Sequence, residues 1–417
     1  MIATMPGLMD AVRSRFAHVE ACPFEGPRIF FENAGGALHL KSVVETSALY
    51  ASYPDNEGRD NAASRALSAA IQQGRADMRI FLNAPDGEVV VGESGTEILF
   101  RLIRTAALKA PAGGVMLGST LEHPASTSAM ARWAEVTGRR HVRLAHDNAT
   151  GAVEVAAYAA AVTPDTRVAS IVHTSPVTGM ATDVAGVAAA IRAVAPDCFI
   201  VVDGIQHASH GAVDVVSYDV DGYAVSPYKM FSRHGYGVGW ASPRLTAADR
   251  EALVGGREGN WELGTRDAGS YATFSDVVDY LVWLGEEAGG AGDRRACLEA
   301  GARAIQSHER RLTEAMLHGV GNLRGLAEIP GVSLIGGPGT ERREGVFSLT
   351  LEGVSAADLV GRLREQGIRV HIRKNDHYCG NVLGPLRIDA CIRVSIAHYN
   401  TEAEVSRFLA AMAEIAG

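Results

Sequence analysis

Short apolar runs rich in Val and Ile recur along the chain, and polar turns or helical patterns separate them. The clearest runs lie at 89–91, 115–117, 167–172, 199–202 and 223–225. Runs of this length without polar alternation are typical of strands that are buried on both faces of a parallel sheet. Between them, apolar positions at helical spacing predict helices at 61–82 and 183–195, the second capped by Asp183. This alternation predicts an α/β fold.

The last third of the chain has a different pattern. After a glycine-rich patch, the predicted elements are a helix at 294–325, strands at 332–336 and 345–352, a helix at 355–366 and a strand at 368–373. Strand pairs followed by helices predict a small α+β domain.

Length and pattern together predict the domain organisation. A chain of 417 residues is too long for one core. We expect residues 1–20 to form an N-terminal segment, helical over 7–20, that packs with the small domain. Residues 21–288 then form the large domain, and residues 289–417 form the small one.

Composition narrows the class of partner. The net charge is −9, which argues against nucleic acid, because binding a phosphate backbone needs clustered Lys and Arg. The chain has no apolar stretch of membrane length, and residues 1–16 lack the core of a signal peptide. The five cysteines are irregularly spaced, which fits free thiols in a reducing cytoplasm. We therefore expect a cytoplasmic protein without a nucleic-acid or membrane partner.

Two patterns in the central region could suggest a metal site or a dinucleotide-binding site, but the residues around them do not support either. His207 and His210 lie close in sequence, but no carboxylate–histidine pattern accompanies them, so we expect no metal site. The glycines at 235–239 lie within a predicted strand and open no helix, which excludes a dinucleotide-binding fingerprint.

Two ionisable groups follow neighbouring apolar runs. Asp203 ends the run at 199–202, and Lys229 comes shortly after the run at 223–225. Ligands of open α/β sheets bind at such strand ends. A lysine can form a Schiff base with an aldehyde, and an aspartate can keep a pyridine nitrogen protonated, as pyridoxal phosphate chemistry requires. Taken alone, the pair also fits an ordinary surface ion pair.

The surrounding motifs carry a family resemblance. Asp203-Gly-Ile-Gln206, Ser226-Pro-Tyr-Lys229 and the glycine-rich strand at 235–239 follow one another in order. In this the chain resembles the class V aminotransferase superfamily, and within it the cysteine desulfurases and their desulfurase-like relatives. The resemblance implies a fold-type I enzyme that binds pyridoxal phosphate. It also implies a mostly parallel seven-stranded sheet in the large domain and a smaller C-terminal α+β domain.

The resemblance also implies the residues that bind the cofactor. Ser94, Gly95 and Thr96 stand where a strand turns into a helix, and the family binds the cofactor's phosphate there. Backbone N–H groups at a helix start favour an anion, although most segments of this kind are plain helix caps. His123 matches the histidine that stacks on the cofactor ring. The remaining contacts that the motifs imply are Asp203, Gln206, Ser226, Lys229 and Thr265.

Further matches concern the substrate and a partner subunit. Thr265 lies in a Glu-x-Gly-Thr motif that reaches the neighbouring subunit's phosphate in the family, which implies a homodimer with composite active sites. Asn33 matches a segment beside the substrate, although an ordinary glycine turn is an equal alternative. Arg393 matches the arginine that binds the substrate α-carboxylate, and a planar guanidinium suits a carboxylate.

Three positions depart from the cysteine desulfurase pattern or leave it open. Pro176 stands where an Asn contacts the cofactor, and proline has no side-chain donor. Tyr228 replaces the His before the lysine. Cys379 matches a nucleophilic cysteine in one alignment, where it would carry a persulfide, and an incidental residue in another.

The function that follows is amino-acid chemistry on pyridoxal phosphate. Lys229 would act as general base with a pKa lowered by desolvation and a nearby cation. We expect carbon–sulfur cleavage, by a desulfurase-like or β-lyase reaction, with His123 and Cys379 as further catalytic candidates. Transamination and epimerisation are the alternatives, and a non-catalytic binding protein is a remote one. The resemblance leaves open whether a sulfur acceptor protein takes part.

Overall fold

A seven-stranded sheet forms the centre of the molecule. The structure is a computed structural model that describes residues 2–248, 251–255 and 261–417. In spatial order the strands are β4 (Glu88–Gly92), β10 (Gly237–Ala241), β9 (Gly222–Val225), β8 (Phe199–Asp203), β7 (Thr166–Val172), β5 (Val115–Ser119) and β6 (Arg140–Leu144). Within the described residues of this sheet, β10 runs in the direction opposite to the other strands. The sheet is therefore mostly parallel, as predicted.

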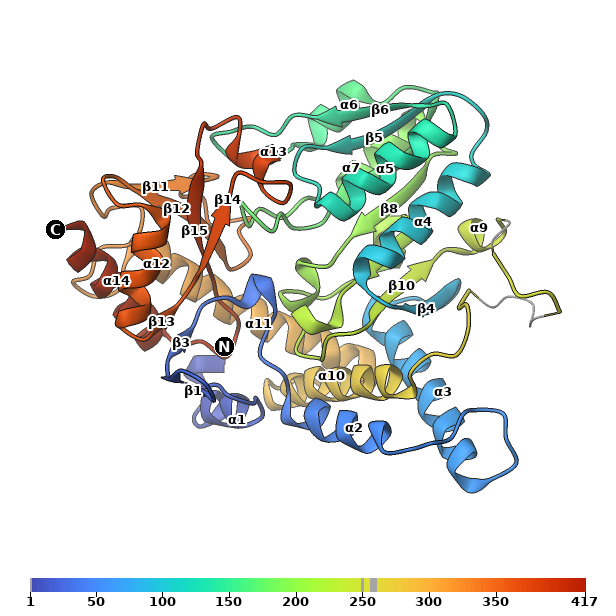
Figure 1. Ribbon diagram of the computed structural model, residues 1–417, viewed down its shortest axis with the longest axis horizontal. Helices are drawn as coiled ribbons and strands as arrows, with labels where there is room; N and C mark the ends of the chain where they lie inside the picture. Colours follow the sequence, from blue (N-terminus) through green and yellow to red (C-terminus); the bar gives the residue numbers. More distant parts are fainter. Residues whose placement is uncertain (1, 249–250, 256–260) are drawn as a thin grey trace.

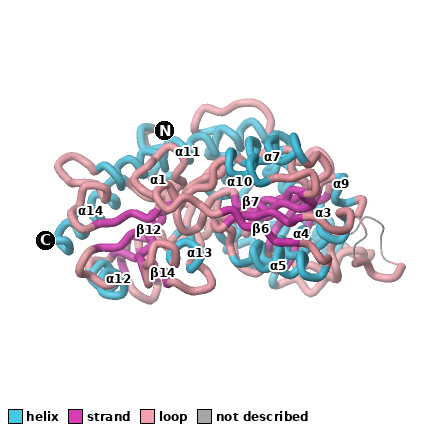
Figure 2. The backbone as a smooth tube through the Cα atoms, turned by 90° about the horizontal axis from the view of Figure 1, so that it is seen from above, coloured by secondary structure: helices cyan, strands magenta, loops and turns pink. Residues whose placement is uncertain are grey.

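Helices cover both faces of this sheet, and Figure 2 shows the strands as a layer between them. The helices before the second sheet are α1 (Leu8–Ser14), α2 (Lys41–Ala51), α3 (Ala62–Leu82), α4 (Gly95–Lys109), α5 (Pro124–Val136), α6 (Val155–Ala161), α7 (Val184–Val194), α8 (Val215–Tyr218), α9 (Pro243–Thr246), α10 (Ala268–Glu287) and α11 (Arg294–His318). None of the helices in the described part of the chain has the length and apolarity needed to cross a bilayer.

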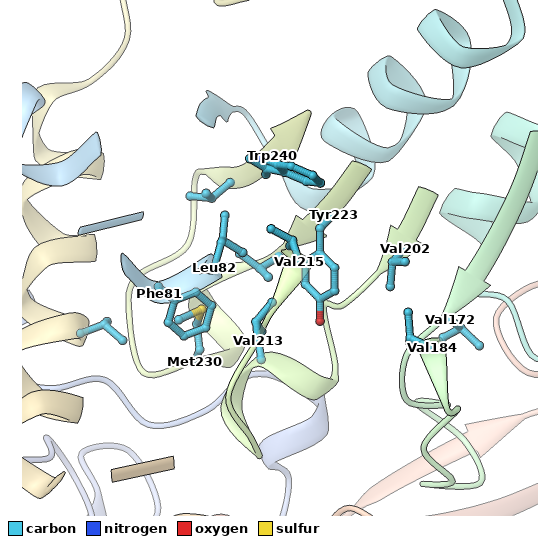
Figure 3. Close-up of a cluster of buried hydrophobic side chains, with 14 of the residues drawn as sticks. Phe81, Leu82, Val172, Val184, Val202, Val213, Val215, Tyr223, Met230 and Trp240 are labelled. Carbon is cyan, nitrogen blue, oxygen red and sulfur yellow. The ribbon is translucent and has the colours of Figure 1, made fainter. Parts of the chain in front are cut away.

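Side-chain alternation along each strand divides the apolar residues between two cores. Val90 and Val201 pack with residues of α4 and α5 on one face. Their neighbours Val91 and Val202 pack on the other face, with residues of α3, α7 and α10. Figure 3 shows this second face, where Val202, Tyr223 and Trp240 project from adjacent strands. Because successive residues of a strand point to opposite sides, a continuous apolar run fills both cores.

A second, antiparallel sheet lies beside the first (Figure 1). Its strands in spatial order are β11 (Val332–Ile335), β12 (Val346–Leu351), β15 (Ala390–Ser395) and β14 (His371–Lys374). The helices of this part are α12 (Ala356–Glu365), α13 (Gly380–Leu383) and α14 (Glu402–Ala416). With the large sheet, this smaller α+β part confirms the predicted fold class.

The N-terminal residues contact both parts. Strand β3 (Ile29–Phe30) pairs with β13 (Ile368–Arg369), and Ile29 lies in the core of the second sheet. From α1, Arg13 donates a 2.6 Å hydrogen bond to the carbonyl oxygen of Tyr399, whereas Phe16 packs in the main core. The boundaries at residues 20/21 and 288/289 stay predictions.

Several predicted elements differ in extent from the observed ones. The helix predicted over 7–20 ends at Ser14, because the following residues bridge to Leu40 and His18 takes a left-handed conformation. The helix predicted over 294–325 ends at His318, where Gly319 has a φ of 99°. The strand predicted over 368–373 is divided between β13 and β14, which pair with different partners.

Close packing of α10 against α11 predicts a stability difference between two glycine substitutions. A Cβ at Gly285 would overlap the carbonyl oxygen of Cys297, whereas Gly361 on α12 has no atom within 4 Å of such a Cβ. We expect Gly285→Ala to lower the free energy of unfolding by about 2 kcal/mol. We expect Gly361→Ala to raise it by about 0.5 kcal/mol. Urea unfolding of the two variants measures both changes, and a Gly285→Ala protein as stable as wild type would contradict the packing.

Candidate active site

A pocket opens at the carboxyl ends of β8 and β9. It is lined by Thr96, His123, Val172, Thr174, Pro176, Asp203, Ile205, Gln206, Ser226, Tyr228 and Lys229. These residues come from five separate stretches of the chain, which the parallel sheet brings to one edge. Six of the residues predicted from the sequence are among them, namely Thr96, His123, Asp203, Gln206, Ser226 and Lys229.

Lys229 ends the short 3-10 helix η4 (Pro227–Lys229) that follows β9. Its amine donates a 3.4 Å hydrogen bond to Oε1 of Gln206. Burial and the nearby Arg393 lower the pKa of Lys229 to about 8, although Asp203 acts in the opposite direction. This confirms the predicted direction. The amine is neutral in a useful fraction near neutral pH, as a general base requires.

Asp203 lies at the end of β8 with its carboxyl group buried. One oxygen accepts a hydrogen bond from the N–H of Ile205 at 3.1 Å, and the other accepts one from the Ser126 hydroxyl at 3.5 Å. Burial raises the pKa of Asp203. A cation placed against this carboxyl would favour its charged form.

Ser126 is a contact that the sequence analysis missed. It lies on α5, three residues after His123, and positions three apart share a face of a helix. That spacing was the available signal. From the sequence, only His123 was predicted at this place.

His123 caps α5 and faces the pocket. Its Nδ1 accepts a hydrogen bond from the Ala125 N–H at 3.2 Å, which places the ring proton on Nε2. Burial and the charge of Lys229 lower the pKa of His123 to about 4. The imidazole is therefore neutral at physiological pH, and such a flat ring can cover an aromatic cofactor without adding charge.

The turn into α4 is tightly packed. The Ser94 hydroxyl accepts a 3.1 Å hydrogen bond from the Glu97 N–H and so caps the helix. A Cβ at Gly95 would overlap the Ser226 hydroxyl, so only glycine allows this close approach. The first N–H groups of a long helix, such as α4, favour a phosphate.

Arg393 is a buried cation without an acidic partner among the described residues. It lies on β15, and its Nη1 donates a 3.0 Å hydrogen bond to the carbonyl oxygen of Pro176. Its Nε is buried and has no hydrogen-bond partner. Burial and the charge of Arg373 lower the pKa of Arg393 to about 10. A carboxylate from outside the chain would complete this site.

Arg373 on β14 is a second positive charge that acts on this site. It contributes to lowering the pKa of Lys229, His123 and Arg393. From the sequence, position 373 was predicted only as the last residue of a strand, with no role in the site. The pairing of β14 with β15 brings Arg373 near the site, and the sequence alone does not indicate this pairing.

The predicted substrate residue Asn33 does not line the pocket. Its amide nitrogen donates hydrogen bonds to the carbonyl oxygens of Phe30 and Ser395, and its oxygen accepts one from the Tyr399 hydroxyl. The amide thus holds the following turn in place. A Cβ at Gly35 in that turn would lie 3.5 Å from Nη2 of Arg393.

Cys379 and Thr265 also lie outside the pocket lining. The Cys379 side chain is buried, and its Sγ accepts a hydrogen bond from Nε of Arg373 at 3.0 Å. Burial raises the pKa of this thiol, which disfavours the thiolate. Thr265 is exposed, and its neighbour Arg266 lies 3.9 Å from the Glu93 carboxylate, next to the start of α4.

These features fit pyridoxal phosphate. The buried, weakly partnered carboxyl of Asp203 suits a protonated pyridine nitrogen, and the amine of Lys229 suits an aldehyde. The start of α4 suits a phosphate because its first N–H groups lie beside the Ser226 hydroxyl, which Gly95 allows to approach closely.

Known proteins resemble this chain over nearly its whole length. The family model described as Aminotransferase class-V matches residues 29–281 and 287–408. A probable cysteine desulfurase of Xylella fastidiosa is 28% identical over 425 residues, which cover 97% of this chain and 95% of that protein. A cysteine desulfurase structure from Thermococcus onnurineus superimposes with a TM-score of 0.83 at 20% identity, covering 99% and 98% of the two chains. One from Escherichia coli gives 0.78 at 24% identity, covering 97% and 98%.

The electrostatics of the pocket predict how Lys229 titrates. Its pKa of about 8 can be measured on protein without cofactor, by competitive labelling of amines across pH and mass spectrometry. Arg393→Gln removes a neighbouring positive charge, so the pKa of Lys229 should rise by about one unit. Arg373→Gln should raise it by less, because Arg393 has the larger effect. An unchanged or lower value in Arg393→Gln would contradict this arrangement.

Proposed function

The chain belongs to the class V aminotransferase family, whose members use pyridoxal phosphate, and on that premise we propose that it cleaves the carbon–sulfur bond of cysteine or of an S-substituted cysteine. One observation carries this proposal. An amine of lowered pKa and a buried acid, Lys229 and Asp203, line one pocket at the edge of the large sheet. Arg393 of the second sheet is buried, has no acidic partner among the described residues, and is hydrogen-bonded to Pro176 of this pocket. The names of the relatives support sulfur as the atom that leaves.

We assign the cofactor contacts as follows. The start of α4, with Ser94, Gly95 and Thr96, would hold the phosphate together with Ser226. Asp203 would hold the ring nitrogen, and the neutral His123 would cover the ring. Gln206, in the same pocket, would contact the ring's edge.

The chain's own groups then perform the substrate chemistry. Arg393 binds the α-carboxylate and so fixes which bond of Cα faces Lys229. The neutral amine of Lys229 removes the Cα proton. When bound, pyridoxal phosphate supplies the sink for the electron pair left at Cα. The sulfur leaves Cβ with its bonding electrons and takes up a proton. The amino-acid remainder reacts with water to give pyruvate and ammonia.

We propose that Cys379 does not carry the sulfur. Its thiol is buried and accepts a hydrogen bond from Arg373, so it is neither exposed nor favoured as a thiolate. The leaving sulfur is thus released as sulfide or thiol, and no acceptor protein is required.

We further propose a homodimer in the reducing cytoplasm, where the five free cysteines would remain reduced. Leu253 and Val254 are apolar and strongly exposed, and the exposed Thr265 does not line the pocket of its own chain. In this dimer Thr265 reaches the phosphate site of the partner subunit, and the partner covers Leu253 and Val254.

Product analysis tests the reaction. L-cysteine and S-substituted cysteines should yield pyruvate with sulfide or the matching thiol. Cys379→Ala should give the same products at the same rate, because the thiol takes no part. Lys229→Ala should lose about 10²-fold or more of the rate, since it lacks the base. Alanine formed from cysteine only when Cys379 is present would instead identify a desulfurase. Racemised substrate, or transfer of the amino group to an oxo acid, would favour the alternatives.

Light scattering of the purified protein tests the dimer. We expect twice the chain mass of 44.0 kDa. The double substitution Leu253→Asp, Val254→Asp should give the mass of one chain, because it places charge on the surface that the partner would cover. A wild-type protein of single-chain mass at micromolar concentration would refute a stable dimer.

A further inference from the structure

A line of hydrogen-bonded, buried polar side chains extends from the active-site pocket to a separate cavity. Gln206 and His210 flank the short helix η3 (His207–Ser209), and Glu309 lies in the middle of α11. Their exposed fractions are 4%, 3% and 4%. Buried polar groups need partners, and hydrogen bonds join these three side chains to one another, whereas Oε1 of Glu309 has no partner among the described residues.

The hydrogen bonds along this line have a consistent direction. Nδ1 of His210 lies 2.6 Å from Oε2 of Glu309, and a carboxylate can only accept, so Nδ1 carries the proton. In a neutral imidazole, Nε2 is then an acceptor. It lies 3.5 Å from Nε2 of Gln206, which donates. The amide is thereby turned so that its Oε1 faces Lys229, at 3.4 Å from the amine.

We propose that Glu309 and His210 are positioning residues for Lys229, acting through the orientation of the Gln206 amide. Glu309 selects the tautomer of His210, His210 fixes the amide of Gln206, and the amide oxygen holds the amine of Lys229. This inference rests on the proposed function insofar as Lys229 is the base of the reaction. Neither Glu309 nor His210 lines the pocket that contains Lys229.

The outer end of the line reaches a separate cavity of about 290 Å³. His210 and Glu309 contribute to its wall, together with Glu344, whereas Gln206 belongs to the active-site pocket. A space of this size holds several water molecules. His210 can therefore exchange a proton with water in this cavity while a substrate fills the active-site pocket.

Protonation of His210 would reverse the line, because Nε2 would become a donor and the Gln206 amide would have to turn. The charged and titratable groups that act on His210 are Glu309 on α11, Glu344 before β12, Lys229 on η4 and His398 after β15. Burial lowers the pKa of His210, but Glu309 outweighs it and raises the pKa. The hold on Lys229 should accordingly weaken as the pH falls, and at a higher pH than the one at which an ordinary histidine takes up its proton.

Two substitutions at Glu309 separate positioning from a simple effect of charge. Glu309→Gln removes the charge but keeps an oxygen that can accept from Nδ1, whereas Glu309→Leu removes both. The readout is the pKa of Lys229, measured by competitive labelling of the full chain before cofactor is added. Glu309→Leu should lower this pKa by about one unit, the size expected when an ammonium group loses one hydrogen bond. Glu309→Gln should match wild type at pH above 8.

Equal shifts in the two variants would overturn the proposal, because they would assign the effect to the lost charge alone. Glu344→Gln is the matched control, since Glu344 is buried in the same cavity wall but accepts from His207 and Thr174. It removes the same charge and should leave the Gln206 amide in place. A drop in the pKa of Lys229 in this control as large as in Glu309→Leu would also overturn it.

The tautomer of His210 gives a second test that needs no variant of Glu309. Nitrogen NMR of the holoenzyme with labelled histidine should show a protonated Nδ1 and an unprotonated Nε2 at pH 8, assigned by the loss of that signal in His210→Asn. A proton on Nε2 would reject the proposal, even if Glu309→Leu fails to fold. Neither readout depends on turnover. A chain without carbon–sulfur cleavage that still shows the expected tautomer and pKa values would refute the proposed function alone.

Discussion

The buried charge of Arg393 is the constraint from which the arrangement of the pocket follows. The guanidinium has a backbone hydrogen bond to Pro176 and a buried Nε without a partner. Leaving a buried cation in this state is costly unless an anion binds. The same charge lowers the pKa of Lys229, so the group that would hold the substrate also prepares the base.

Arg393 lies on the second sheet, whereas Lys229 and Asp203 lie on the first, so the site depends on how the two parts are fastened. Glu344, before β12, is one of the side chains that link them. It accepts hydrogen bonds from Thr174 and His207, both beside the large sheet. Burial alone would raise the pKa of Glu344, but His207 lowers it to about 2. The carboxylate therefore stays charged, and this link persists across the physiological pH range.

The departures from the desulfurase pattern have a structural counterpart in this chain. The backbone carbonyl of Pro176 accepts a hydrogen bond from Arg393, so this contact does not depend on the side chain at position 176. Tyr228 lines the pocket and stacks on His234, with ring centroids 4.3 Å apart. Cys379 is buried against Arg373. Together these positions favour a pocket in which the sulfur of the substrate leaves without passing to the protein.

Sequence alone determined the elements with strong apolar patterns and the strand ends that carry Asp203 and Lys229. Those features are local, because a buried parallel strand needs a short apolar run and its carboxyl end is where ligands bind. It did not reveal Ser126, Arg373 or the line from Gln206 to Glu309. Each of these depends on which strands pair and which helices pack together, and contacts between residues far apart in the chain leave no periodic signal. For the same reason, Asn33 and Cys379 matched motifs by position, whereas only the tertiary structure decided that their polar atoms are used within the protein.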